Sequence, residues 1–595
     1  MRLFRPRAWL LGTFGSLTVT ACLQVPNAPK HECESTPDCD RAHGEVCEDG
    51  TCWGDPPTDQ LTYLVSPPAE HTELVPLELT DLRIDDDGRL PLITFEQPIS
   101  FSGRLDVSCV MPMLCDAAKL NATVTVSRES LFAGGPGFRT VSATTASTDG
   151  AAFSIKVPPF RASADYAITI VPQPRSENDP NSLAQLVPPL HRDVKTLSDI
   201  QKALTLGALD LEHIEGTLLA SSGSGLANYR VVAMGRWEEN SAPTEVSTVA
   251  FTGSDGSFRL FISKDAMSPT EIVASPADPT SVAPTLRLPL VQGAFATLAG
   301  QTTLSQPPNL GSPRPKMIHI TARDGGGNEK DIVGARVRVG AKVPTPDGGT
   351  AEIYAEANTD DGGIAMLSLL DGAIAQEFTL DVVPPASATV GAIYAQPYSS
   401  DSDGKVQLPT RVRLRGHVVD SMGEKLAGVS VTARPSYRFA WNLDADAQTF
   451  LSSISVSTAV TNDSGEYVVW VDPALAGISA TYDLSMDPAR STGTRERAPS
   501  YTESDIAIGQ NMANDSITVN EIRLPDAAFV HGNVIDPVGT PIENAEVKVF
   551  RQATDYTSIC SSSQHAPTPC PVHARLLGRG AANATGTVEL TLPRE

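Results

Sequence analysis

Residues 414–433 read LRGHVVDSMGEKLAGVSVTA, and residues 461–471 read TNDSGEYVVWV. Apolar and polar side chains alternate in both stretches, a period of two that is typical of a strand with one face on a core and the other in water. Gly423 lies midway between two alternating runs, where it indicates a hairpin-like turn. Gly465 follows Asn462 in a second turn, where glycine supplies a positive φ and the Asn side chain can hydrogen-bond back. These residues predict three strands joined by tight turns.

The same three-part pattern recurs five times, at intervals of about 100 residues, which indicates an array of similar modules. The opening strands lie near Gly103, Gly216, Ile320, Gly416 and Gly532. Helical periodicity is nearly absent, so we predict an all-β protein, a tandem array of five β-sandwiches. Pro-rich stretches at 54–60 and 305–316 indicate stiff boundaries and a linear, beads-on-a-string layout.

The fourth and fifth copies carry a family resemblance. Residues 414–433 and 461–471, together with VHGNVIDPVGTPIENAEVKVFR at 530–551, resemble carboxypeptidase regulatory-like domains. The resemblance implies a transthyretin-type β-sandwich for each module. The third copy departs from the pattern, because Ile320 stands where the others have glycine. The resemblance implies little about function, since one fold serves many functions.

The first 21 residues have the features of an export signal. Three arginines precede a short apolar stretch at 8–19, and small residues then lead to Cys22. The sequence VTAC at 19–22 resembles a bacterial lipobox, which implies a diacylglycerol on the Cys22 thiol and a further acyl chain on its amine. Two or more acyl chains anchor a protein stably to a membrane. An ordinary secretory cleavage site is the alternative. Leu23, which is not the Asp of the inner-membrane retention pattern, favours the outer membrane.

The cysteine count agrees with export. Nine cysteines less Cys22 leave eight, an even number that an oxidising compartment would pair as disulfides. They fall into three groups: Cys33, Cys39, Cys47 and Cys52; Cys109 and Cys115; and Cys560 and Cys570. The first group resembles the Cys-rich tethers that follow the lipid in bacterial surface lipoproteins, and its three possible connectivities stay open. Zinc is the alternative for this group, but no Cys-x2-Cys spacing occurs.

Charge and motifs exclude several classes of function. The net charge of −25 opposes nucleic-acid binding, which requires neutralisation of phosphates by basic residues. No nucleophile, phosphate-binding or zinc-peptidase motif with a catalytic domain beside it occurs, so we expect no enzyme, no cofactor and no metal site. The acidic loops at 85–88, 360–363 and 401–404 lack the spacing of a helical calcium loop and are interpreted as turns.

Together these signals predict a lipid-anchored, non-enzymatic cell-envelope protein that serves adhesion, scaffolding or partner binding. It would lie at the outer membrane, facing the periplasm or the surface, with an envelope protein or a glycan as partner. The predicted organisation is a signal peptide (1–21), a Cys-rich tether (22–60) and five sandwiches (92–211, 212–311, 312–410, 411–525 and 526–595). The alternative is a carbohydrate-binding surface lipoprotein, for which Tyr229, Trp237, Tyr437 and Trp441 are the candidate sugar platform.

The fifth module is expected to be incomplete. Few residues follow its closing turn at Gly586, whereas the second to fourth modules continue much further before the next module opens. An open sheet edge leaves unpaired N–H and C=O groups. A smaller closed sandwich, a truncated gene product and a strand donated by a partner are the three outcomes that the sequence leaves open.

Overall fold

The structure is a computed structural model, and strands dominate it. It describes residues 32–108, 121–128, 141–145, 152–159, 166–173, 185, 187–194, 204–207, 213–219, 224–237, 243–278, 281, 283–290, 301–303, 313–323, 327–344, 350–370, 378–386, 388–399, 404–488, 498–509, 516–553, 555–566 and 573–594. The predicted all-β class is confirmed. No helix in the described part of the chain has the length and apolar character needed to span a membrane.

Five β-sandwiches follow one plan, a sheet of three or four strands facing a layer of four or five. In the first sheet, the opening strand lies between an antiparallel strand and a parallel one. Sandwich 1 has β12 (Leu204–Gly207), β6 (Ile99–Ser108) and β9 (Ala152–Val157) in the first sheet, and β11 (Leu190–Val194), β10 (Tyr166–Gln173), β7 (Asn121–Arg128) and β8 (Val141–Thr145) in the second.

Sandwiches 2 and 3 repeat this plan and share a sheet. Sandwich 2 has β17 (Ser257–Phe261), β13 (His213–Thr217) and β20 (Gln301–Thr303), facing β15 (Thr244–Glu245), β16 (Ala250–Phe251), β14 (Tyr229–Gly235), β18 (Glu271–Pro276) and β19 (Thr285–Pro289). Sandwich 3 has β22 (Glu329–Asp331), β25 (Ile364–Leu370), β21 (Pro313–Arg323) and β28 (Lys405–Gln407), facing β24 (Thr350–Asn358), β23 (Arg336–Pro344), β26 (Phe378–Val383) and β27 (Ile393–Tyr398).

The join between sandwiches 2 and 3 is a strand pair. Strand β19 pairs antiparallel with β24, so the two four-stranded layers form one continuous sheet over one hydrophobic core. Arg287 on β19 reaches Glu352 on β24, with Nη1 and Oε2 3.7 Å apart. A linear layout of separate beads is therefore wrong for these two modules, because backbone hydrogen bonds cross their boundary.

Sandwich 4 adds helices that the sequence did not predict. Its sheets are β32 (Glu466–Val471), β29 (Val412–Val419), β37 (Ser516–Thr518) and β38 (Ile522–Arg523), facing β31 (Ser457–Val460), β30 (Ser430–Pro435), β35 (Thr481–Asp487) and β36 (Tyr501–Ala507), with the small hairpin β33 (Ala474–Leu475) and β34 (Ile478–Ser479). Helices α2 (Tyr437–Ala440) and α3 (Ala445–Ser453) lie between β30 and β31. Ser436 and Asp444 cap them by accepting hydrogen bonds from Phe439 N and Ala447 N.

Sandwich 5 is complete, so the expectation of an incomplete fifth module is wrong. Its first sheet is β42 (Thr587–Pro593), β39 (Ala527–Ile535) and β5 (Ile93–Thr94); its second is β41 (His573–Ala581), β40 (Glu546–Ala553), β3 (Leu61–Ser66) and β4 (Leu77–Leu82). Helix α4 (Asp555–Ser562) follows β40. The N-terminal strands occupy the places that the last strands of each preceding sandwich fill. Strand β5 also shows that the predicted start of sandwich 1 at residue 92 is too early.

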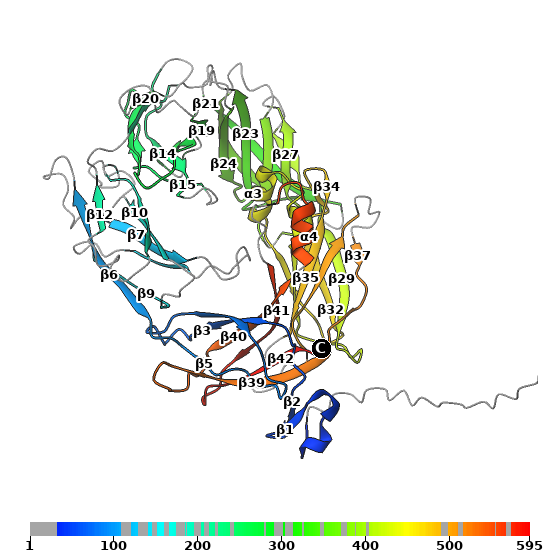
Figure 1. Cartoon of the computed structure of the whole chain (residues 1–595). Coiled ribbons are helices and arrows are strands. Elements are labelled where there is room, and N and C mark those ends of the chain that lie inside the picture. The colour runs from blue at the N-terminus through cyan, green and yellow to red at the C-terminus, as the bar shows by residue number, and fades with distance from the viewer. Residues whose placement is uncertain are drawn as a thin grey trace, which may run out of the picture.

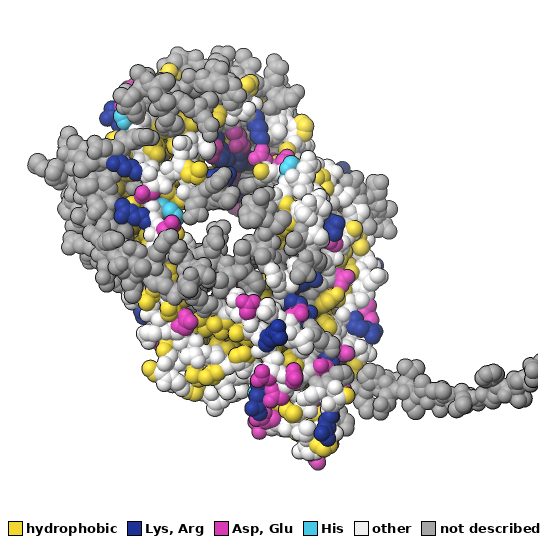
Figure 2. Space-filling view, in the orientation of Figure 1, with side chains coloured by type: hydrophobic (Ala, Val, Ile, Leu, Met, Phe, Trp, Pro, Cys, Tyr) yellow, Lys and Arg dark blue, Asp and Glu magenta, His cyan; other side chains and the backbone are white. Residues whose placement is uncertain are grey.

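The five sandwiches form a closed ring. Figure 1 shows the chain running from β6 around to β39, where the N-terminal strands meet the C-terminal ones. The space-filling view in Figure 2 shows the opening that the ring encloses. The ring forms because one sandwich is built from both ends of the chain.

Candidate functional site: the closure of the ring

Strands β3 and β5 bury the apolar face that their alternating sequence provides. Leu61, Tyr63 and Val65 on β3 are fully buried between β4 and β40, where Tyr63 pairs with Val549. Ile93 and Phe95 enter the same core, and β5 pairs in parallel with Val534 and Ile535. Full burial of one such side chain is worth about 1.5–3 kcal/mol, so these five residues supply on the order of 10 kcal/mol to closure.

The turn at 85–88 brings the N-terminal segment close to β39. Gly88 N donates to Asp85 O, and His531 N donates to Gly88 O, so the acidic loop is a turn, as the sequence predicts. At Gly88, with a φ of +76°, a Cβ would lie 2.8 Å from Phe529 O. A Cβ on Gly532 would lie 2.6 Å from the Cβ of Leu90. Two glycines therefore permit this close approach of backbones.

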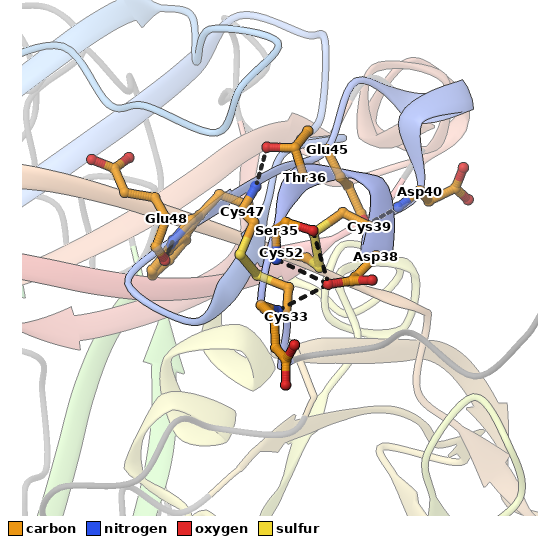
Figure 3. Close-up of a disulfide and its surroundings, with 12 residues drawn as sticks. Cys33, Ser35, Thr36, Asp38, Cys39, Asp40, Glu45, Cys47, Glu48 and Cys52 are labelled. Atoms are coloured by element: carbon orange, nitrogen blue, oxygen red, sulfur yellow. Dashed lines mark hydrogen bonds between the residues drawn. A yellow bond between two sulfur atoms is a disulfide. The ribbon is translucent and has the colours of Figure 1, made fainter.

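Residues 32–55, which we call the Cys-rich module, form a small disulfide-bonded unit (Figure 3). Cys33 pairs with Cys47 and Cys39 with Cys52, which selects one of the three open connectivities and excludes a zinc site on these sulfurs. Short elements surround the bridges: η1 (Thr36–Asp38), η2 (Arg41–His43), β1 (Val46–Glu48) and β2 (Thr51–Trp53). Asp38 accepts hydrogen bonds from the amides of Glu34 and Ser35.

The Cys-rich module, which lies within the predicted tether (22–60), is docked on sandwich 5. Trp53 forms a buried cluster with Ala527 and Phe529 of β39. Gly54 N donates to Phe529 O at 3.2 Å. The ring of Trp53 also packs on His531, with centroids 4.4 Å apart. An apolar contact and a backbone hydrogen bond thus fix the module to the closing sandwich.

Arg594 links the end of β42 to the Cys-rich module. Its Nε lies 2.8 Å from Asp55 Oδ2, and its Nη2 donates to Glu45. The side chains of Arg594, Glu45 and Asp55 are 16%, 11% and 15% exposed. Burial lowers the pKa of the Arg594 guanidinium from its usual value. Charges this deeply buried depend on their partners, so the three residues act as a unit.

Acidic side chains gather where the Cys-rich module meets the ring, as Figure 2 shows over β1 and β2. Arg89 bridges two of them, contacting Glu48 at 3.1 Å and Asp87 at 3.3 Å. His531 Nε2 lies 3.5 Å from Glu48. Burial nevertheless lowers the pKa of His531 and outweighs the opposing effect of Glu48, so the docked imidazole favours its neutral form.

Sandwich 4 closes against sandwich 5 through α2 and α4. Trp441 is buried with Ala553, Ile559 and Cys560, and His565 N donates to Trp441 O. Arg579 on β41 lies 2.6 Å from Asp487 on β35. The two sandwiches are thus joined by an apolar cluster and by an ion pair.

The proposed sugar platform is wrong in its geometry. Tyr229 and Trp441 are both only 5% exposed, because the first lies in the core of sandwich 2 and the second in the contact between sandwiches 4 and 5. Tyr437 packs on Trp441, and Trp237 stacks on His191 with ring centroids 5.2 Å apart. The four aromatic residues therefore serve packing and form no common exposed face.

Several predicted site residues lie outside the described part of the chain. They are Cys22, Cys109, Cys115 and Cys570. Cys560 is described and is disulfide-bonded. The loop at 360–363 is a turn in which Asp360 accepts from Gly362 N and Ile364 N. This side chain is used by the backbone of its own turn, as the sequence predicts.

Comparisons with known proteins give distant similarities of structure. No protein-family model matches the chain, and no curated protein matches it. The Bacillus anthracis TIE protein is 11% identical, with 68% of each chain covered and a TM-score of 0.14. The shaft pilin spaA from Lactobacillus rhamnosus GG is 10% identical over 36% of this chain and 98% of that chain, with a TM-score of 0.17. The Streptococcal ancillary pilin is 9% identical over 52% and 98%, also with a TM-score of 0.17. At these TM-scores no functional conclusion follows from the similarities.

Proposed function

We propose that this protein is a non-enzymatic scaffold of the bacterial cell envelope, held at the outer membrane by lipid on Cys22. The observation that carries the proposal is the closure of the ring. The Cys-rich module that follows Cys22 is docked through Trp53 and Arg594 on the sandwich that closes the ring. A pull on the anchor would therefore act on a closed body of five sandwiches.

The ring suits a scaffold because it fixes the relative positions of its modules. Sandwiches 2 and 3 share a sheet, and sandwiches 4 and 5 share an apolar cluster. Between sandwiches 3 and 4, Ala392 N donates to Asp472 at 2.9 Å, and Lys342 lies 2.5 Å from Asp446. Surfaces presented by such a body keep a constant spacing, which is what a scaffold for an envelope partner requires.

Two measurements test the proposal. Cells that express the wild type or Cys22→Ser are labelled with a radioactive fatty acid and fractionated, and the variant is expected to lose both the label and the outer-membrane fraction. Equal labelling would contradict the lipid anchor. A cross-linking pull-down from intact cells with the wild type is expected to recover a defined envelope partner. Recovery of no partner under conditions that capture a known envelope complex would contradict the scaffold.

A further inference from the structure

Residues 61–95, which we call the closing segment, are held in sandwich 5 by noncovalent contacts, as a bound peptide would be. The closing segment binds between β40 of one sheet and β39 of the other, and we call these two strands the seat. Backbone hydrogen bonds hold the segment on both strands of the seat. Strand β3 pairs with β40 from Leu61 to Ser66, and Phe95 N donates to Ile535 O. Nothing in these contacts distinguishes the segment of the same chain from that of a second copy.

The contacts of the ring are unequal, and sandwich 1 differs from the others. Sandwiches 2 and 3 share a sheet, and sandwiches 4 and 5 share an apolar cluster. In the described residues, no strand of sandwich 1 pairs with a strand of another sandwich. Its described contacts include the stack of His191 on Trp237 and the hydrogen bond from Lys156 Nζ to Thr72 O at 3.2 Å. Sandwich 1 follows the closing segment directly, with four residues between β5 and β6.

We propose that the seat on sandwich 5 also accepts the closing segment of a second copy of this chain, which gives head-to-tail association by strand exchange. An exchanged pair can retain every described contact within sandwich 5, so among the described contacts the two arrangements differ in those between sandwich 1 and its neighbours, and they also differ in effective concentration. The contact is heterologous, because the segment and the seat are different surfaces, and it therefore builds larger rings or open chains. The proposal does not depend on the lipid anchor.

Exchange has to occur while the protein folds. The closing segment contributes nine buried hydrophobic side chains to the core of sandwich 5, and it leaves only when that core opens. A closed monomer and an exchanged assembly therefore interconvert slowly once formed. Refolding at a high chain concentration is expected to trap exchanged assemblies that survive dilution, and refolding at a low concentration is expected to give the closed monomer.

The experiment uses two variants of the unacylated chain, residues 22–595 with Cys22→Ser, each of which carries one added cysteine. Leu64 and Lys548 are directly opposed on β3 and β40, and both are partly exposed. Leu64→Cys and Lys548→Cys chains are mixed, co-refolded and oxidised, and then analysed on a non-reducing gel. A disulfide between the two chains forms at this position only if a segment from one copy sits in the seat of the other.

The matched control is a mixture of Met317→Cys and Met366→Cys chains. These residues are also opposed, on β21 and β25, and are 62% and 52% exposed, but both strands lie within sandwich 3. We expect at least tenfold more covalent heterodimer from the 64/548 mixture than from the control at high refolding concentration, and none from either at low concentration. Equal yields from the two mixtures, or no heterodimer at any concentration, would overturn the proposal.

Discussion

Arg594 donates a hydrogen bond to Glu45, a residue 549 positions earlier in the chain. Both side chains are largely buried, and Asp55 completes the unit. The two ends of the chain are therefore joined by charged groups that need one another, in addition to the apolar core beneath them.

Arg594→Gln is expected to loosen the Cys-rich module. Removal of the cation takes away the positive charge that the largely buried Glu45 and Asp55 share, and loss of one partner of a buried ion pair costs about 3 kcal/mol. The loss of stability is measured as faster hydrogen exchange of the amides in residues 45–55. Lys342→Gln is the control, because its pair with Asp446 is exposed (64% and 66%) and is worth less than about 1 kcal/mol. Equal effects of the two substitutions would contradict the importance of burial.

Gly532→Ala is expected to weaken the closure itself. The new Cβ would lie 2.6 Å from the Cβ of Leu90, so backbone has to move, and overpacking of this kind costs about 1–3 kcal/mol. Faster hydrogen exchange in residues 88–95 and 529–535 would show that the closure is weakened. Gly509→Ala, where no atom lies within 4 Å of the added Cβ, serves as the control and should leave both segments unchanged.

Cys39→Ser/Cys52→Ser is expected to destabilise the Cys-rich module without opening the ring. Loss of a disulfide costs about 2–4 kcal/mol, whereas the core under β3 and β5 supplies several times more. Hydrogen exchange should therefore rise in residues 33–55 and stay slow at Leu61–Ser66. Loss of protection in β3 would show that the disulfides support the closing strands directly.

Mild acid is expected to weaken the docking of the Cys-rich module. Because the folded-state pKa of His531 lies below its ordinary value of 6.5, the unfolded state binds more protons as the pH falls. The contribution to stability is present above pH 6.5 and is lost as the pH falls through that value. Exchange over residues 45–55 between pH 7.5 and 5 measures it. His531→Gln should flatten this dependence relative to a His417→Gln control, and an unchanged slope would contradict the assignment.

The five copies of the strand pattern could be predicted because each depends on nearby residues. Alternation places Leu414 opposite Val469 in the core of sandwich 4, and the turn glycines Gly423 and Gly465 have the positive φ that their positions indicate. The disulfide clusters were likewise visible in the spacing of the cysteines. These features follow from local chemistry.

The completion of sandwich 5 could not be predicted in the same way. Residues 61–66 show the alternation of an ordinary strand, but their local sequence does not specify β40, about 480 residues later, as the partner strand. The short stretch after Gly586 predicts an open edge, and the three outcomes expected for it do not include a strand from the same chain. The exposure of the aromatic residues could not be predicted for a related reason, because Trp441 is buried by contacts with α4 of another sandwich.

The split of sandwich 5 between the two ends of the chain has a consequence for how the molecule comes apart. In a linear repeat protein, each end unit lacks one neighbour, so the ends need polar caps and fraying starts there. In this chain β3, β5 and β42 belong to the same sandwich, and within the described residues every sandwich contacts two others. The first unit to unfold deprives two others of support at once, so the ring has no weak end from which unfolding can begin.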